Sequence, residues 1–128
     1  MSTIGNGVDI IENSRIEKAI KKVAFIERVF SKKEIELSLK YKNKTNYYAK
    51  RFSAKEAFYK ALGTGIREGN SFKYISIQND KNGKPFIEIN NQIKKMIFKR
   101  FKLKKFKIHL SLSDEKKHSI AFVILDKI

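Results

Sequence analysis

The sequence predicts an α+β fold in which a largely antiparallel sheet packs against one long buried helix. Residues 51–66, RFSAKEAFYKALGTGI, carry apolar side chains around most of a helix, which is typical of a helix buried in a core. From residue 74 onward the apolar pattern changes to period 2, and Asn82-Gly83 is a strong hairpin signal. The resulting order of strand, helices, hairpin, helix and hairpin favours α+β over an alternating parallel architecture.

The first predicted strand covers residues 4–12, IGNGVDIIE. Asp9 is unusual there, because aspartate is depleted within strands. Two interpretations stay open. Asp9 either ends the strand or caps the helix that follows, or its carboxylate belongs to a functional site.

Local capping signals predict the next two helices. Asn13-Ser14 is a predicted N-cap, and Glu17, three residues after Ser14, completes a capping box. They open a predicted helix over residues 15–23 whose exposed side is basic. Residues 25–30 form a short apolar patch. The capping-box spacing recurs at residues 31–34, which predicts the start of a second helix.

A polar segment, residues 40–46, is predicted to form a loop before the central helix. Gly63 is predicted to end that helix, because glycine suits the left-handed position after a helix terminus. Gly65 leaves the loop Gly63-Thr64-Gly65 open to close approach by another group. The remaining predicted elements are strands over 74–78 and 85–89, a helix over 91–101, and strands over 106–111 and 120–125.

Two charged side chains on the central helix require an explanation. Glu56 and Lys60 are four residues apart, so they share one stripe, and helix geometry alone favours a weak surface ion pair. Alternatively, both face a cleft in which the carboxylate holds a metal and the ammonium meets a phosphate. Asp9 and Glu56 together supply two carboxylates from separate elements, which can hold Mg²⁺ with a substrate phosphate and waters.

The composition narrows the possible classes of protein. The 128 residues fit a single domain over 1–128, and the absence of cysteine excludes disulfides and thiolate chemistry. His109 and His118 are expected to be exposed strand residues, too few for a structural zinc site. The first twenty residues carry several charges, and no apolar run approaches the roughly 20 residues that cross a bilayer. We therefore expect a cytoplasmic protein that acts away from membranes.

The net charge of +16 attracts acidic partners, and one basic run is an alternative functional site. Its cations are Lys94, Lys95, Lys99, Arg100, Lys102, Lys104, Lys105 and Lys107. Phe98, Phe101 and Phe106 are interleaved with them, so a nucleic-acid-binding module could contact phosphates and stack bases here. A solvated helix face over core aromatic residues is the simpler interpretation, and we expect no nucleic acid partner.

Four motifs occur in the order found in one known family. They are GVDI at residues 7–10, RFSAKEAFYKALGTGI at 51–66, NGKP at 82–85 and SLSD at 111–114. Over nearly its whole length the chain resembles the holo-acyl-carrier-protein synthases. The resemblance implies transfer of the phosphopantetheine arm of coenzyme A to a serine of apo acyl carrier protein, for fatty acid synthesis. It also implies Mg²⁺ and a homotrimer with active sites at subunit interfaces.

The same resemblance implies roles for particular residues. Asp9 and Glu56 match the metal-binding carboxylates, and Glu56 and Lys60 the catalytic pair. Coenzyme A contacts are implied for Lys55, Lys60, Gly63, Thr64, Gly65, Gly83, Lys84 and Pro85. Arg15 and Arg28 lie where the family docks its acidic carrier. Asp114 stands where many members have histidine, so no role is transferred to it.

Overall fold

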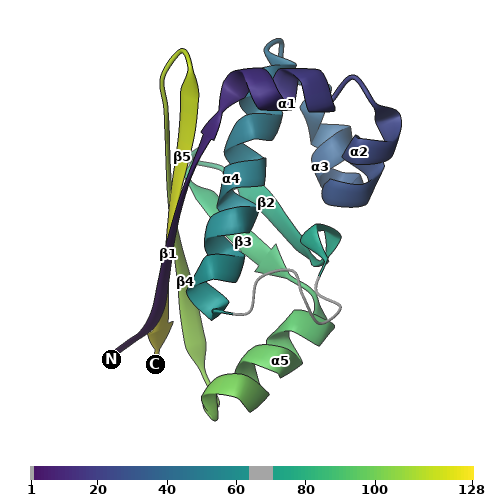
Figure 1. The fold of residues 1–128 in the computed structure, drawn as a ribbon. Helices are drawn as coiled ribbons and strands as arrows, with labels where there is room; N and C mark the ends of the chain where they lie inside the picture. Colours follow the sequence, from purple (N-terminus) through teal and green to yellow (C-terminus); the bar gives the residue numbers. More distant parts are fainter. Residues whose placement is uncertain (1, 64–70) are drawn as a thin grey trace.

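The computed structural model describes residues 2–63 and 71–128. In chain order the elements are β1 (Ser2–Glu12), α1 (Asn13–Ala19), α2 (Val23–Val29), α3 (Lys32–Ser38), α4 (Lys44–Leu62), the 3₁₀ helix η1 (Phe72–Tyr74), β2 (Ile75–Asn79), β3 (Pro85–Ile89), α5 (Asn91–Phe101), β4 (Phe106–Asp114) and β5 (His118–Lys127). Figure 1 shows α4 through the middle, the sheet of β1, β5 and β4 along one side, α1 to α3 at one end and α5 at the other. The predicted α+β class is confirmed.

Both sheets are antiparallel. The larger one has the order β1-β5-β4, and β2 pairs with β3 in a separate two-stranded sheet. Along β5 the side chains alternate, so that Ala121, Val123 and Leu125 are fully buried against the core. This inner face of the larger sheet covers α4.

Two glycines set how closely β1 approaches α4. A Cβ atom on Gly5 would overlap the carbonyl oxygen of Ala61, and one on Gly7 would overlap that of Ala57. Only glycine allows the two backbones to touch in this way. Alternate residues of β1 therefore face α4. Gly5 faces Ala61, and Gly7 faces Ala57, one turn nearer the N-terminus of the helix. Asp9 is the next residue of β1 on this face. The strand continues to Glu12, so the interpretation that Asp9 ends it is wrong.

The long helix is longer than predicted at its start. Asn43 caps it, and the Asn43 side chain accepts a hydrogen bond of 2.9 Å from the backbone N–H of Asn46. Residues 44–46 are therefore helical, and the predicted loop ends earlier. Gly63 ends the helix in the left-handed region at φ 77°, as predicted.

The capping box predicted at Ser14 and Glu17 is wrong. Helix α1 begins at Asn13, and the side chain of the N-cap residue, Glu12, makes no capping hydrogen bond. The Asn13 amide bonds instead to the β4–β5 turn. Its Nδ2 donates to the carbonyl oxygens of Glu115 and Lys116, and its Oδ1 accepts from Ser119 Oγ at 2.7 Å. The helix ends at Ala19 rather than Val23.

The apolar patch predicted at residues 25–30 is mostly helix. It forms α2, which places Val29 and Phe30 in a second buried cluster with Tyr47 and Tyr48 of α4. This helix has no local cap signal, so tertiary packing rather than capping defines it. The second predicted capping box is present, since Ser31 Oγ accepts from Glu34 N and Glu34 Oε1 accepts from Ser31 N.

The C-terminal half follows the prediction closely. Asn90 caps α5 by accepting a 2.9 Å hydrogen bond from Ile93 N, and the β2–β3 and β4–β5 hairpins form. His109 and His118 lie on strands and are partly exposed. Among the described helices, none is long and apolar enough to cross a membrane.

Candidate active site

The close contact between β1 and α4 brings Asp9 and Lys60 together. Lys60 Nζ donates to Asp9 Oδ1 at 3.2 Å and to the carbonyl oxygen of Val8 at 3.1 Å. The Asp9 side chain is 13% exposed and the Lys60 side chain 55%. Within the described chain Lys60 thus pairs with Asp9 across two elements, and the expected ion pair between Glu56 and Lys60 does not form.

Glu56 lies beside this pair, one turn earlier on α4. Burial raises the pKa of Glu56, and the negative charge of Asp9 raises it further, against the opposing effects of Lys60 and Arg15. Burial also raises the pKa of Asp9, whose hydrogen bond to Lys60 lowers it. The two carboxylates therefore share one partly buried place and repel each other.

These two carboxylates fit a hard divalent cation. Mg²⁺ takes oxygen ligands and keeps several waters, so one or two protein carboxylates with a substrate phosphate are a sufficient ligand set. Among the described residues there is no group of three or more His, Cys, Asp or Glu side chains that could hold a metal. Any metal bound by Asp9 and Glu56 thus needs oxygen atoms from the substrate and from water.

Arg15 and Arg28 lie on the helices at one end of the molecule. Arg15, on α1, is close enough to lower the pKa of both Asp9 and Glu56. Arg28 is in the last turn of α2, with its guanidinium 5.9 Å from the centre of the Phe25 ring. Both side chains are exposed.

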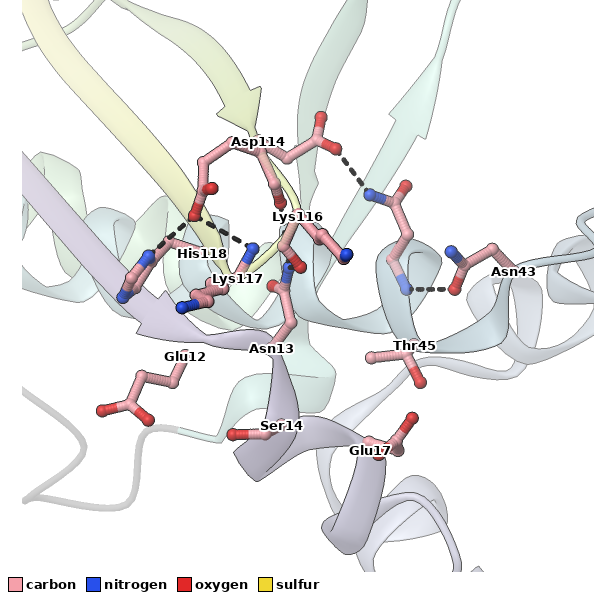
Figure 2. A pocket seen from close by; sticks show the side chains of 12 residues that line it. Glu12, Asn13, Ser14, Glu17, Asn43, Thr45, Asp114, Lys116, Lys117 and His118 are labelled. Carbon is pink, nitrogen blue, oxygen red and sulfur yellow. Dashed lines mark hydrogen bonds and ion pairs between the residues drawn. The ribbon is translucent and has the colours of Figure 1, made fainter.

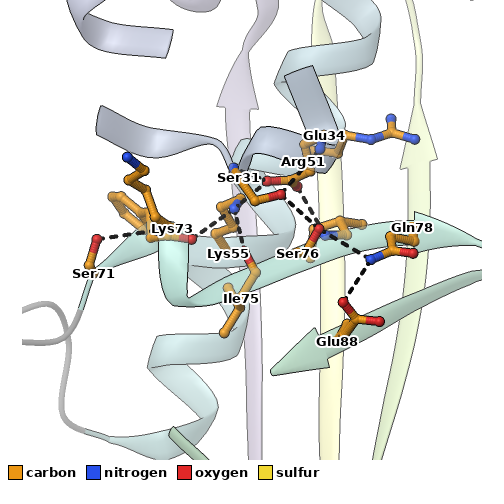
Figure 3. Close-up of polar contacts among 12 residues, drawn as sticks. Ser31, Glu34, Arg51, Lys55, Ser71, Lys73, Ile75, Ser76, Gln78 and Glu88 are labelled. Atoms are coloured by element: carbon orange, nitrogen blue, oxygen red, sulfur yellow. Dashed lines mark hydrogen bonds and ion pairs between the residues drawn. The ribbon is translucent and has the colours of Figure 1, made fainter. Parts of the chain in front are cut away.

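Lys55 does not have the position expected of a coenzyme A ligand. Its side chain is 0% exposed and pairs with the equally buried Glu34 at 2.6 Å. Lys55 Nζ also donates to the carbonyl oxygens of Phe72 and Ile75, and Figure 3 shows it enclosed between α3 and β2. All three ammonium protons have protein acceptors, so the prediction that Lys55 binds coenzyme A is wrong for this structure.

The predicted turn around Gly83 is held by the side chain of Asp80. Gly83 has φ 85°, and Asp80 Oδ1 accepts from the N–H groups of Asn82 and Lys84. Lys84 is exposed and Pro85 begins β3. Two other predicted contacts, Thr64 and Gly65, lie outside the described residues.

Sequence reasoning missed Arg51, which connects this turn to α4. Arg51 Nη2 donates to Asn79 Oδ1 at 2.9 Å, and Asn79 Nδ2 donates to the carbonyl oxygen of Gly83. The guanidinium is 3.6 Å from the centre of the Tyr47 ring. Its Nε is buried without a partner in the described structure. A signal existed, because an arginine on an otherwise buried helix calls for partners.

A groove of about 890 Å³ opens at the tip of the β4–β5 hairpin. Figure 2 shows it between that tip and the first residues of α1 and α4. Asp114 lies at its edge, where it accepts a 2.7 Å hydrogen bond from Asn46 and pairs with Lys50 at 3.6 Å. None of the described site residues implied by the motifs lines this groove.

The aromatic residues of the basic run over residues 94–107 pack inward on the core. Phe98, Phe101 and Phe106 are half-buried and pack on the main hydrophobic cluster. Phe98 and Phe106 also pack edge-to-face, with ring centres 5.5 Å apart. The lysines therefore form a solvated face over core aromatic residues, as the simpler interpretation holds.

Comparison with known proteins identifies the class of protein to which this fold and site belong. The family model of the 4'-phosphopantetheinyl transferase superfamily matches residues 5–123. A holo-[acyl-carrier-protein] synthase from Pelagibacter ubique is 56% identical over 127 residues, which cover 99% of each chain. The chain belongs to the holo-acyl-carrier-protein synthase family.

Solved structures agree with this assignment. The holo-[acyl-carrier-protein] synthase of Neisseria meningitidis is 38% identical and superimposes with a TM-score of 0.87, covering 98% of this chain and 99% of the other. That of Bacillus anthracis, solved in complex with CoA (3',5'-ADP), is 35% identical with a TM-score of 0.83 and complete coverage of both chains.

Proposed function

We propose that this chain transfers the 4'-phosphopantetheine arm of coenzyme A to a serine hydroxyl of apo acyl carrier protein, giving the holo carrier for fatty acid biosynthesis. The observation that carries the proposal is the pairing of Lys60 with Asp9 at 3.2 Å, beside Glu56, on the motifs of the family. Relatives named for this activity, and one solved with CoA (3',5'-ADP), support it. We propose that residues 1–128 act as one domain; a cytoplasmic location stays a prediction.

The reaction forms one P–O bond and breaks another. The serine oxygen bonds to the phosphorus that carries pantetheine, the bond from that phosphorus to the bridging oxygen breaks, and 3',5'-ADP leaves. Charge spreads over the phosphoryl oxygens, so positioning and positive charge are the main demands on the enzyme. The exposed Lys60 ammonium supplies charge next to those oxygens. Glu56, which lies on α4 beside Asp9 and Lys60, is the group we assign to receive the serine proton.

Asp9 and Glu56 would hold Mg²⁺. The bound ion would act as a Lewis acid that stabilises the negative charge on the phosphoryl oxygens. Asp9 also orients Lys60 through their hydrogen bond. Coenzyme A would contact Lys60 and Gly63 at the end of α4. The Gly83-Lys84-Pro85 turn would contact coenzyme A bound to a neighbouring subunit.

We propose that the active enzyme is a homotrimer. The outer face of the larger sheet supports this, because Val8 and Phe122 lie opposite each other there and so do Ile10 and Ile120. All four are exposed, Ile10 by 62% and Phe122 by 42%. A contiguous exposed apolar face of this kind marks an interaction site, and the family resemblance identifies its occupant as further copies of the chain.

Charge on the apolar sheet face is expected to abolish assembly. The double variant Ile10→Glu and Phe122→Glu should be monomeric by light scattering at micromolar concentration, because two carboxylates would be desolvated at each interface. Leu39→Glu, at an apolar side chain that is 81% exposed elsewhere, is the matched control and should stay trimeric. A wild-type protein that is monomeric and fully active would refute the shared site.

Charge reversal at the carrier surface should affect one substrate only. Arg15→Glu with Arg28→Glu is expected to raise the KM for carrier protein and to flatten its dependence on salt, because rim charges act mainly on encounter. The KM for coenzyme A should change little. Equal losses for both substrates would show that these arginines support the fold or the coenzyme A site instead.

Mass spectrometry tests the proposed function itself. Apo acyl carrier protein incubated with this protein, coenzyme A and Mg²⁺ should gain the mass of one phosphopantetheine group. A carrier whose acceptor serine is changed to alanine should gain none. If the unmodified carrier also gains no mass, the proposal fails.

A further inference from the structure

A cation from α5 lies at the end of α4. A Cβ atom built on Gly63 would be 3.3 Å from Arg100 Nη2, so the Arg100 guanidinium lies directly against the glycine that ends the helix. Arg100 is in the last turn of α5, and its guanidinium carbon is 5.9 Å from the centre of the Phe101 ring. A side chain at position 63 would force the guanidinium to shift. The backbone at Gly63 has φ 77°, which also disfavours any residue other than glycine.

Lys60 lies in the last turn of the same helix, three residues before Gly63. Its side chain is exposed and is engaged with Asp9. Two cations, one from each helix, therefore lie near the end of α4. Gly63 is exposed and has no side chain, so a ligand can approach the Arg100 guanidinium at this helix end.

The segment of the chain that contains Arg100 is strongly positive. Residues 91–113 contain eight lysines and arginines and no Asp or Glu. Among the described residues, no carboxylate lies within ion-pair distance of Arg100. The α4 carbonyl oxygens near Gly63 are already bonded in part, since Tyr59 O and Lys60 O both accept from Gly63 N. A guanidinium with no carboxylate partner among residues 2–63 and 71–128 suits a phosphate group, which it can bind with two parallel hydrogen bonds.

We propose that Arg100 is a further coenzyme A-binding residue, whose guanidinium binds a phosphate group of coenzyme A at Gly63. This inference rests on the proposed function, because it assigns Arg100 to the same substrate. The alternative is that Arg100 only stabilises the C-terminal end of α4 through the helix dipole. The two differ in their effect on substrate binding.

The variant Arg100→Gln separates them, with Lys95→Gln as the matched control. Both positions are exposed on α5 and both changes remove one positive charge. Loss of a charge-assisted hydrogen bond should weaken coenzyme A binding by about tenfold in Arg100→Gln, measured by calorimetry, with the KM for coenzyme A raised alike and kcat little changed. Lys95→Gln should leave both values within about twofold. Arg100→Lys should fall between, since it keeps the charge and loses the planar fork.

Dephospho-coenzyme A, which lacks the 3'-phosphate, identifies the phosphate. If Arg100→Gln and wild type bind dephospho-coenzyme A equally well, Arg100 binds the 3'-phosphate. If Arg100→Gln binds dephospho-coenzyme A about tenfold more weakly than wild type does, Arg100 binds the pyrophosphate. Equal coenzyme A affinity in Arg100→Gln and Lys95→Gln, with a lower melting temperature only in Arg100→Gln, would overturn the inference in favour of the helix-end role. Failure of the wild type to transfer phosphopantetheine would instead remove the proposed function.

Discussion

Replacing either Asp9 or Glu56 with alanine is expected to lower kcat/KM for phosphopantetheine transfer by about 100-fold or more, which corresponds to roughly 3 kcal/mol in the transition state. Both carboxylates are needed for the cation that stabilises the phosphoryl charge, and Glu56 is also the assigned proton acceptor. Initial rates measured over a range of coenzyme A and carrier concentrations, at several concentrations of Mg²⁺, test this. Normal turnover in either variant would remove that residue from the site.

The same variants should stay folded, and the metal-free protein should be at least as stable as wild type. Asp9 and Glu56 both have raised pKa values in the fold, so the folded state holds their protons more tightly than the unfolded state does. Their contribution to the free energy of unfolding is therefore largest at low pH and falls as pH rises above about 4 through the raised values. Glu56→Ala should flatten that decline in metal-free melting curves. Glu56→Ala that melts well below wild type at pH 7 would indicate a structural role instead.

Lys55→Met is expected to lower the free energy of unfolding by about 3–5 kcal/mol, because it leaves the Glu34 carboxylate charged and unpaired in the core. Both side chains are fully buried, and Lys55 Nζ lies 2.6 Å from Glu34 Oε1. Glu34 Oε2 also accepts from Ile77 N, so the pair joins α3, α4 and β2. Chemical denaturation gives the value directly.

The double variant Lys55→Met with Glu34→Leu is the control. It should recover part of the lost stability, since no charge is left buried, although Ser31 N, Ile77 N and two carbonyl oxygens lose their partners. Its KM for coenzyme A should match that of wild type. A raised KM in this double variant, with the protein folded, would restore Lys55 as a coenzyme A ligand.

The elements that the sequence predicted well are those with local signals. Asn82-Gly83 formed its hairpin turn, and Gly63 ended α4 as the left-handed cap. The failures occurred where a side chain had a distant partner. Asn13 bonds to the β4–β5 turn more than 100 residues away, so the local capping signal beside it did not apply. Helix α2 is defined by packing onto α4, which no local pattern records.

The candidate site was predicted only in part, because local sequence patterns do not record contacts between distant residues. Asp9 and Glu56 stood out as charges in apolar stretches, but nothing local shows that Lys60 pairs with Asp9 rather than with Glu56. The signal that was overlooked is the pair Gly5 and Gly7, because glycines inside a strand indicate close backbone approach. Lys55 was misassigned because its partner, Glu34, is 21 residues away and was read only as part of a capping box.

Calorimetric titration of Mg²⁺ tests most directly whether Asp9 and Glu56 form one metal site with the substrate. The titration is made into wild type, Asp9→Ala and Glu56→Ala, each with coenzyme A present. Wild type should bind Mg²⁺ at one site per chain, and each variant should bind it at least about tenfold more weakly, which is roughly 1.4 kcal/mol. Equal Mg²⁺ affinity in all three proteins would contradict the assignment of these carboxylates to the metal.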